Sequence, residues 1–178
     1  MVEKIDVVDE RDRVIGKALR SMVHKKRLRH RRVAVLIFMD DSYQHTLIQK
    51  RSKMKDVAPG KWAHLEGHIL AGESYLQGAK REIEEEMFQG KTVKLKNKLE
   101  LLFKLKSSLD QDQVFLAVYR TILNGPFKLQ KEEVAQYKFI RVPELVRDIK
   151  AHPRKYTETA RAVFIEYAQE FYHGRRNH

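Results

Sequence analysis

Apolar positions along this chain fall mainly into short runs with the two-residue alternation of β-strands. The segment 31–39 becomes an almost continuous apolar run, which is typical of a strand buried on both faces of a sheet. Further strands are predicted at residues 5–8, 14–19, 46–51, 99–105, 114–123 and 137–142. The turn at residues 9–12 joins the first two of these strands into an N-terminal hairpin.

Helical periodicity is confined to three segments. Ser74 and Gln77 form a capping-box pair just after Gly72, so the first helix is predicted to begin at Ser74. Its buried stripe, spaced by three and four residues, comprises Leu76, Ala79, Ile83 and Met87. Two later helices are predicted at residues 143–150 and 156–172, and the stripe of the second comprises Ala160, Val163, Phe164, Tyr167 and Phe171. Strands with helices on both sides indicate an α/β fold with a mixed sheet in a three-layer α/β/α arrangement.

The first predicted helix carries three carboxylates on one face. Glu82, Glu85 and Glu86 stand at positions i, i+3 and i+4, whereas Glu84 points away from them. Neighbouring like charges repel, and a hard divalent cation with oxygen ligands, Mg²⁺ or Mn²⁺, would remove that cost. The alternative is an ordinary solvated acidic face, which the helical spacing by itself favours because glutamate-rich helices are common.

The residues that precede the trio favour the metal site. The chain reads as Gly67, five residues, Glu73, seven residues and then the hexapeptide REIEEE that starts at Arg81. This spacing resembles the Nudix box, the signature of the Nudix hydrolases. The resemblance implies a Nudix-type α/β/α sandwich, in which a loop–helix–loop unit binds Mg²⁺ against a diphosphate. One departure is that Phe88 and Gln89 stand where the family has a glycine and an apolar residue.

The resemblance also implies roles for individual residues. The implied metal ligands are Glu82, Glu85, Glu86 and the backbone carbonyl of Glu66. The catalytic set is these three helical acids with Arg81, and either Glu82 or Glu86 is the candidate general base. Gly67 and Glu73 are structural residues of the box, and Arg81 is expected to pair with Glu73. Candidates for binding the phosphates are Lys50, Arg51 and Lys53, for which a solvated surface is the alternative. Asp112 or Glu132 would complete the site.

Beyond the box, the chain resembles the branch of the superfamily that includes isopentenyl-diphosphate isomerase and its hydrolase relatives. The resemblance rests on VDERDRVIGKALR near the start, on two histidines before the first long strand and on KDVAPGKW before the box. In the isomerases, histidines and a spaced pair of acids bind a metal. The matching positions here are His24, His30, His68, Asp110 and Asp112. The isomerases also need a cysteine acid where this chain has Glu66. For His68, a neutral histidine hydrogen-bonded beside the metal loop is the favoured interpretation.

Composition narrows the class of protein further. A chain of 178 residues suffices for one domain. We expect a hairpin and basic segment at 1–30, the Nudix box at 67–88 and a frayed tail at 174–178. The absence of cysteine excludes disulfides and thiolate metal sites, and it fits a reducing cytoplasm. The first residues lack a signal-peptide core, and no apolar run is long enough to span a bilayer. We therefore expect a cytoplasmic protein without a membrane partner.

The net charge is +12, and the basic residues are spread unevenly, with two segments in which they crowd together. These are Lys25, Lys26, Arg27, Arg29, Arg31 and Arg32, and then Lys91, Lys94, Lys96 and Lys98. Such surfaces attract nucleotides, pyrophosphates and RNA, and a purely solubilising surface is the alternative. The sequence thus predicts a Mg²⁺-dependent Nudix hydrolase that cleaves a diphosphate linkage in a nucleoside diphosphate derivative. The alternatives are an isomerase-like enzyme and a basic RNA- or nucleotide-binding Nudix protein without turnover, and a homodimer is compatible with either.

Overall fold

A computed structural model describes residues 3–55, 57–93, 95, 97–107 and 113–172. The strands are β1 (Lys4–Val8), β2 (Val14–Leu19), β3 (His30–Phe38), β4 (His45–Arg51), β5 (Trp62–Ala63), β6 (Leu65–His68), β7 (Glu100–Ser107), β8 (Val114–Ile122) and β9 (Val134–Arg141). The helices are α1 (Arg20–Lys25), α2 (Tyr75–Phe88), α3 (Val142–Ala151) and α4 (Glu158–Tyr167), with a 3₁₀ turn at Pro153–Lys155 and a π-helical turn at Ala168–Tyr172. The tail expected at 174–178 lies outside the described residues.

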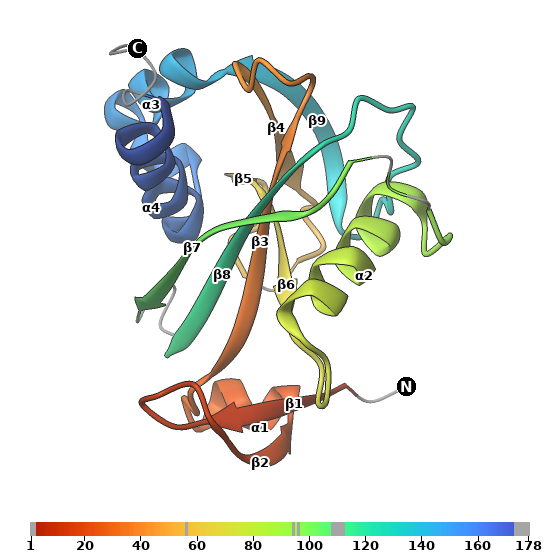
Figure 1. The fold of residues 1–178 in the computed structure, drawn as a ribbon, viewed down its shortest axis with the longest axis vertical. Coiled ribbons are helices and arrows are strands. Elements are labelled where there is room, and N and C mark those ends of the chain that lie inside the picture. Colours follow the sequence, from red (N-terminus) through yellow and green to blue (C-terminus); the bar gives the residue numbers. More distant parts are fainter. Residues whose placement is uncertain (1–2, 56, 94, 96, 108–112, 173–178) are drawn as a thin grey trace.

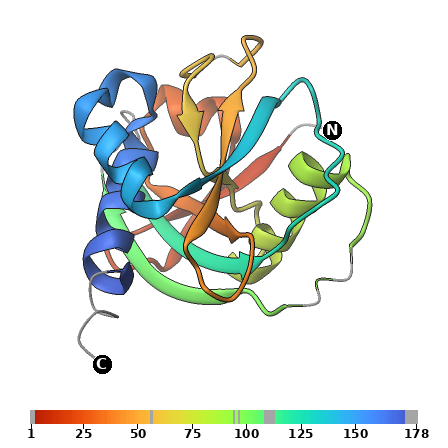
Figure 2. The same cartoon turned by 90° about the horizontal axis from the view of Figure 1, so that it is seen from above.

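A mixed sheet separates the helices into two layers. Strands β2, β1, β3, β4 and β5 follow one another as hydrogen-bonded neighbours, β6 and β8 also pair with β3, β7 pairs with β8, and β9 pairs with β4. The β3–β8 pair is parallel, whereas β3–β6 and β7–β8 are antiparallel. Helix α2 lies on one side of the sheet, and α3 and α4 lie on the other (Figures 1 and 2). The predicted α/β/α architecture with a mixed sheet is therefore confirmed.

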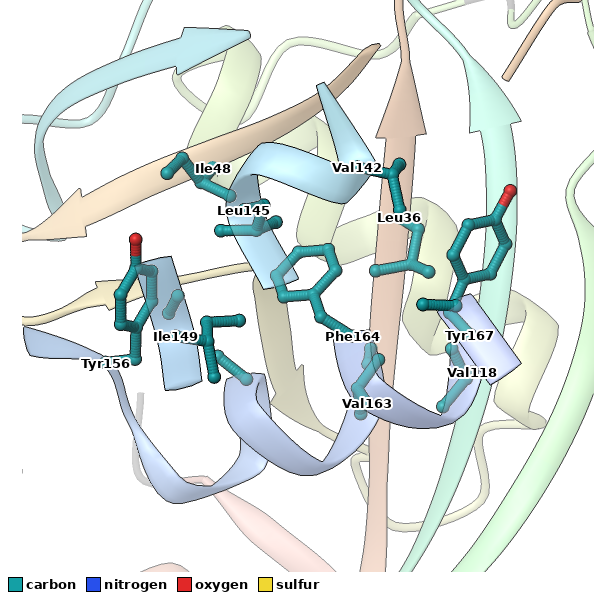
Figure 3. Packing of buried hydrophobic residues seen from close by; sticks show 14 of the residues in the cluster. Leu36, Ile48, Val118, Val142, Leu145, Ile149, Tyr156, Val163, Phe164 and Tyr167 are labelled. Carbon is teal, nitrogen blue, oxygen red and sulfur yellow. The ribbon is translucent and has the colours of Figure 1, made fainter. Parts of the chain in front are cut away.

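The alternation of side chains along β3 fills both layers from a single strand. Val33 and Val35 share a buried cluster with Ile83 of α2. Leu36, which points to the opposite face, shares a second cluster with Phe164 of α4 (Figure 3). This arrangement explains the unbroken apolar run in the sequence, because a strand covered on both faces has no solvent-facing positions.

Helix α2 begins and ends where its local signals place it. Ser74 Oγ accepts a hydrogen bond from Gln77 N at 3.2 Å, and Gln77 Oε1 accepts one from Ser74 N at 2.8 Å, so the predicted capping box is present. The helix ends at Phe88, and Gln89 follows with a φ of 54° in the left-handed region. The turn out of the helix therefore falls at the residue after Phe88, and the chain accommodates a side chain at the position where the family has glycine.

The buried stripe of α2 differs from the prediction at its first position. Three of its four predicted residues are buried, namely Ala79, Ile83 and Met87. The prediction for Leu76 is wrong, since this residue is 41% exposed. At the first turn it is Tyr75 that packs, partly buried, against the cluster that contains Ile83. Ile69 packs against Gly78, where an added Cβ would lie 2.4 Å from Ile69 Cδ1.

The N-terminal hairpin is present and is attached to the central strand. Strands β1 and β2 pair antiparallel, and Asp9 Oδ1 closes their turn by accepting hydrogen bonds from Arg11 N at 2.8 Å and Arg13 N at 3.0 Å. β1 joins β3 through the pair Val7 and His30. The short helix α1 was not predicted, because Val23 is the one residue within its bounds that is buried, which leaves too little periodicity to detect.

Other departures from the prediction occur where elements are short or interrupted. β5 and β6 were not predicted, because they span two and four residues and depend on pairing with distant strands. β9 begins at Val134, earlier than the predicted start at residue 137. The single helix predicted at 156–172 starts later, because Thr157 caps α4 by accepting a hydrogen bond from Ala160 N. No helix within the described residues is both long and apolar enough to cross a membrane.

Substitutions at Ile83, which is buried, and at Leu76, which is exposed, test directly how α2 packs on the sheet. Ile83→Ala is expected to lower the free energy of unfolding by about 2–5 kcal/mol, because it empties a fully buried site. Leu76→Ala is expected to change it by less than about 0.5 kcal/mol, because the side chain is largely solvated. Urea denaturation of both variants measures the difference. Equal losses would mean that Leu76 packs in the core.

Candidate active site

A cavity of about 880 Å³ opens beside the acidic edge of α2. Residues of α1, β6 and α2 contribute to its walls, together with the loops after β4 and before β9. The carboxylates that line it include Glu66, Glu82, Glu85, Glu86, Glu132 and Glu133. The cationic residues that line it include Arg20, Arg27, Arg32, Arg51, Lys55 and Arg81. Acidic and basic side chains therefore share one space, which suits a ligand that combines a metal cation with phosphates.

Arg81 connects the loop of the box to the acids of α2. Its Nε donates to Glu73 Oε1 at 2.8 Å, so the predicted Arg81–Glu73 pair is present. Its Nη1 donates to Glu82 at 2.7 Å and to Glu85 at 2.9 Å. Its Nη2 donates to the backbone carbonyl of His68 at 2.7 Å. One guanidinium thus sets the distance between the β6 loop and the helix.

The predicted acidic trio divides into two buried members and one outer member. Glu82 and Glu86 are buried, and Gln49 Nε2 donates to Glu86 at 2.5 Å. Burial raises the pKa of both carboxyls, and the charge of Glu82 raises that of Glu86 further. The Glu85 side chain is 46% exposed and is held by Arg81. The strongest demand for a compensating cation therefore lies at Glu82 and Glu86.

Gly67 allows the backbone of β6 to approach these acids. It stands opposite Val33 in the β3–β6 register, on the side of the sheet that α2 covers. A Cβ at this position would lie 1.9 Å from Glu82 Cδ and 2.0 Å from Glu82 Oε1. Any side chain here would displace the carboxylate, so the glycine of the box is required by the close approach rather than by its backbone angles.

The donors predicted from the sequence are of the chemical type that suits a hard divalent cation. Glu82, Glu85, Glu86 and the carbonyl of Glu66 offer oxygen atoms, which Mg²⁺ and Mn²⁺ prefer. A cation would also stabilise two buried acids as carboxylates. Within the described residues, no three His, Asp or Glu side chains form a ready-made metal-binding group, and Arg81 bridges Glu82 and Glu85.

The side chain of Glu66 has a partner set that the sequence analysis missed. Arg32 Nη2 lies 3.1 Å from Glu66 Oε1, Arg51 Nη1 lies 3.8 Å from the same oxygen, and Thr159 Oγ1 donates to Oε2 at 2.9 Å. Burial alone would raise the pKa of Glu66, but the charges of Arg32, His64 and Arg51 lower it to about 2. The signal was an acid inside an apolar segment, since such acids are seldom buried without partners.

The structure separates the three predicted phosphate-binding residues. Arg51 lines the cavity. Lys50 is not among the cavity-lining residues described, and its Nζ lies 5.9 Å from the ring centroid of Trp62. Lys53 is exposed and is not among the cavity-lining residues described. Lys55, which sequence reasoning did not select, lines the cavity and pairs with Glu133.

Three histidines meet beside the cavity, and two of them, His24 and His68, line it. The ring centroid of His68 lies 5.0 Å from that of His24 and 5.2 Å from that of His30. Burial, together with the charges of Arg32 and Arg20, lowers the pKa of His68 well below its usual range, which favours the predicted neutral form. The hydrogen bond expected for His68 is absent at Nε2, which has no partner among the described residues.

Of the late acids considered, Glu132 lines the cavity. Asp110 and Asp112 lie outside the described residues.

The basic segment at residues 25–32 does not form one free cationic surface. Arg29 pairs with Glu10 and donates to Gln113, and Arg31 Nε donates to Asp12 at 2.6 Å. Arg32 is buried against Glu66. These cations are held within the fold, so a count of charges along the sequence overstates the charge that a polyanion would meet.

The chain is similar to known proteins in both sequence and fold. The NUDIX domain family model matches residues 28–162. An uncharacterized Nudix hydrolase of Yersinia pestis is 35% identical over 146 residues, which cover 81% of this chain and 75% of that protein. The crystal structure of DR0079 from Deinococcus radiodurans matches with a TM-score of 0.76 at 20% identity. The match covers 92% of this chain and 98% of the DR0079 chain. The NUDIX domain of Shewanella oneidensis NrtR, solved with ADP ribose, matches with a TM-score of 0.58 at 18% identity. The match covers 79% of this chain and 86% of that domain's chain.

Gly67→Ala tests whether the close approach of β6 to Glu82 matters for metal binding. The added Cβ must displace the Glu82 carboxylate, so the affinity for Mg²⁺ should fall roughly 10- to 100-fold. Titration calorimetry with MgCl₂ and MnCl₂ measures this. Gly16→Ala is the matched control, because a Cβ there meets nothing within 4 Å. Wild-type affinity in Gly67→Ala would contradict the assignment of Glu82 as a ligand.

Proposed function

This chain belongs to the Nudix hydrolases, and from that premise we propose that it cleaves a diphosphate linkage in a nucleoside diphosphate derivative with the help of Mg²⁺. The observation that carries the proposal is the cavity in which buried Glu82 and Glu86 share a space with Arg51 and Arg32. Hydrolysis of a diphosphate needs a general base, compensation of phosphate charge and a positioned water molecule. The two walls of the cavity contain groups for the first two tasks.

The residues of the chain divide the work as follows. Glu86, held by Gln49 Nε2, is positioned to accept a proton from the attacking water, with Glu82 as the second acid of the pair. Arg81 keeps Glu82 beside the β6 loop. Glu82, Glu85, Glu86 and the carbonyl of Glu66 would hold Mg²⁺, which when bound supplies positive charge for the phosphate oxygens and activates water.

The substrate class is proposed from the size and charge of the cavity. A volume of about 880 Å³ is within the range of small-molecule sites and admits a ligand larger than pyrophosphate alone. The NUDIX domain of Shewanella oneidensis NrtR was solved with ADP ribose, a nucleoside diphosphate derivative, which supports the same class here. Arginines suit this class because their planar forks match phosphate oxygens.

The alternatives have less support from these contacts. An isomerase would need a proton donor at the position of Glu66, but this carboxylate accepts a hydrogen bond from Thr159 and pairs with Arg32 and Arg51. For an RNA-binding protein without turnover, the basic segment at 25–32 would have to be free, whereas Arg29, Arg31 and Arg32 have partners within the fold. Hydrolysis remains the function that the site supports best.

Glu86→Gln tests the proposal while keeping the shape of the side chain. Turnover should fall at least about 100-fold, because the variant loses both a candidate base and a metal ligand. The assay is phosphate release, with a coupled phosphatase where needed, over nucleoside di- and triphosphates, dinucleotide cofactors and isopentenyl diphosphate, with and without Mg²⁺. Glu84→Gln is the control, because Glu84 Oε1 accepts from Val93 N away from the trio, and it should keep activity within about twofold. Unchanged activity in Glu86→Gln would remove the assignment.

A further inference from the structure

The two faces of β6 have different chemical surroundings. Gly67 stands opposite Val33 on the face covered by α2, where the acids lie. Glu66 stands opposite Ala34, whose cluster lies on the face covered by α3 and α4, so its carboxylate points away from the acids. The backbone carbonyl assigned to the metal and the side chain of the same residue therefore have separate surroundings.

The Glu66 carboxylate is placed between two guanidiniums of the cavity wall. Arg32 Nη2 and Arg51 Nη1 lie 3.1 and 3.8 Å from Glu66 Oε1. The three side chains are 10%, 14% and 5% exposed for Arg32, Arg51 and Glu66. Two positive charges thus share one negative charge, and one positive charge is left on this wall. A phosphate would be attracted to the excess.

Arg32 also has unused hydrogen-bonding capacity. The residue is 8% exposed and lines the cavity, and its Nε is buried without a hydrogen-bond partner among the described residues. A buried donor on a permanently charged group is costly to leave unpaired. A phosphate oxygen is the acceptor that both the charge and the planar geometry of a guanidinium favour.

We infer that Arg32 binds the phosphate chain of the substrate together with Arg51, and that the side chain of Glu66, held by Thr159, is the positioning residue that fixes the Arg32 guanidinium and, together with the Val57 carbonyl that accepts from Arg51 Nε at 3.0 Å, that of Arg51. The inference rests on the proposed function, because it takes the diphosphate of that substrate as the ligand. Thr159 Oγ1 donates to Glu66 Oε2, and Thr159 itself is fully buried. The positioning chain therefore runs from the start of α4 to the cavity wall.

Two roles for the Glu66 carboxylate, positioning the guanidiniums or only reducing their charge, predict opposite effects of Glu66→Gln on diphosphate binding. If its carboxylate only reduces the positive charge of the wall, Glu66→Gln should bind a diphosphate more tightly. If the carboxylate fixes the guanidiniums, the same variant should bind it less tightly, because Arg32 becomes free to turn away and Arg51 keeps only the hydrogen bond from its Nε to the Val57 carbonyl. Glu66→Gln keeps the backbone carbonyl, so Mg²⁺ binding should be little affected in either case.

The experiment measures binding of inorganic pyrophosphate and of α,β-methylene-ADP to the full chain by calorimetry, with and without Mg²⁺. Arg32→Lys and Glu66→Gln are each expected to weaken probe binding roughly tenfold, since hydrogen bonds to charged groups are lost or misplaced. Thr159→Val, which lies outside the cavity lining and keeps every charge, is expected to weaken binding roughly threefold. Thr121→Val is the matched control, because its buried hydroxyl has no hydrogen-bond partner among the described residues, and it should bind as wild type.

The outcomes are distinct. Tighter or unchanged probe binding in Glu66→Gln would overturn the positioning role, and wild-type binding in Arg32→Lys would remove Arg32 from the phosphate site. If Glu66→Gln is unstable in thermal unfolding, Thr159→Val decides, and wild-type binding in it would overturn the inference. The probes need no turnover. A wild-type protein that binds them in this pattern but hydrolyses no substrate would therefore count against the proposed function and not against the phosphate site.

Discussion

The site depends on one guanidinium that fastens a loop to a helix. Arg81 donates to Glu73 at the start of the loop–helix unit, to Glu82 and Glu85 on α2, and to the carbonyl of His68 at the end of β6. A single side chain therefore fixes how far β6 stands from the acidic edge of the helix. Such a network contributes more to the geometry of the site than to stability, because much of its attraction offsets the cost of desolvating the charges.

The position of β6 in turn separates the chemistry into two halves. On the side of α2, Gly67 leaves room for the Glu82 carboxylate, and Glu86 lies buried near it. On the side of α4, Glu66 pairs with Arg32 and Arg51 at the wall of the same cavity. In our account, a metal-bound diphosphate would lie between the two faces. Some of its oxygens would contact the dication on one face, and others would contact the guanidiniums on the other face. Consecutive residues of one strand accomplish this separation because their side chains point in opposite directions.

Sequence patterns predicted the parts of this arrangement that local chemistry determines. The capping box at Ser74 was predictable because it involves only neighbouring residues of the chain. The apolar run of β3 was predictable because a strand that is covered on both faces is apolar at nearly every position. Leu76 was predicted to be buried but is exposed, because which residue of the first turn packs depends on contacts with other segments, and it is Tyr75 that packs against the core cluster. The role of the Glu66 side chain was missed for the same reason, since its partners lie on β3, β4 and α4. Contacts between distant segments leave little local pattern to read.

The most direct test of the central claim is anomalous diffraction from crystals grown with MnCl₂. The account predicts a manganese peak bounded by carboxylate oxygens of Glu82 and Glu86 and by the backbone carbonyl of Glu66. It also predicts that Arg32 and Arg51 stay on the opposite wall of the cavity, paired with the Glu66 carboxylate. A peak found only among His24, His30 and His68, or no peak beside α2 at a manganese concentration that supports activity, would contradict it.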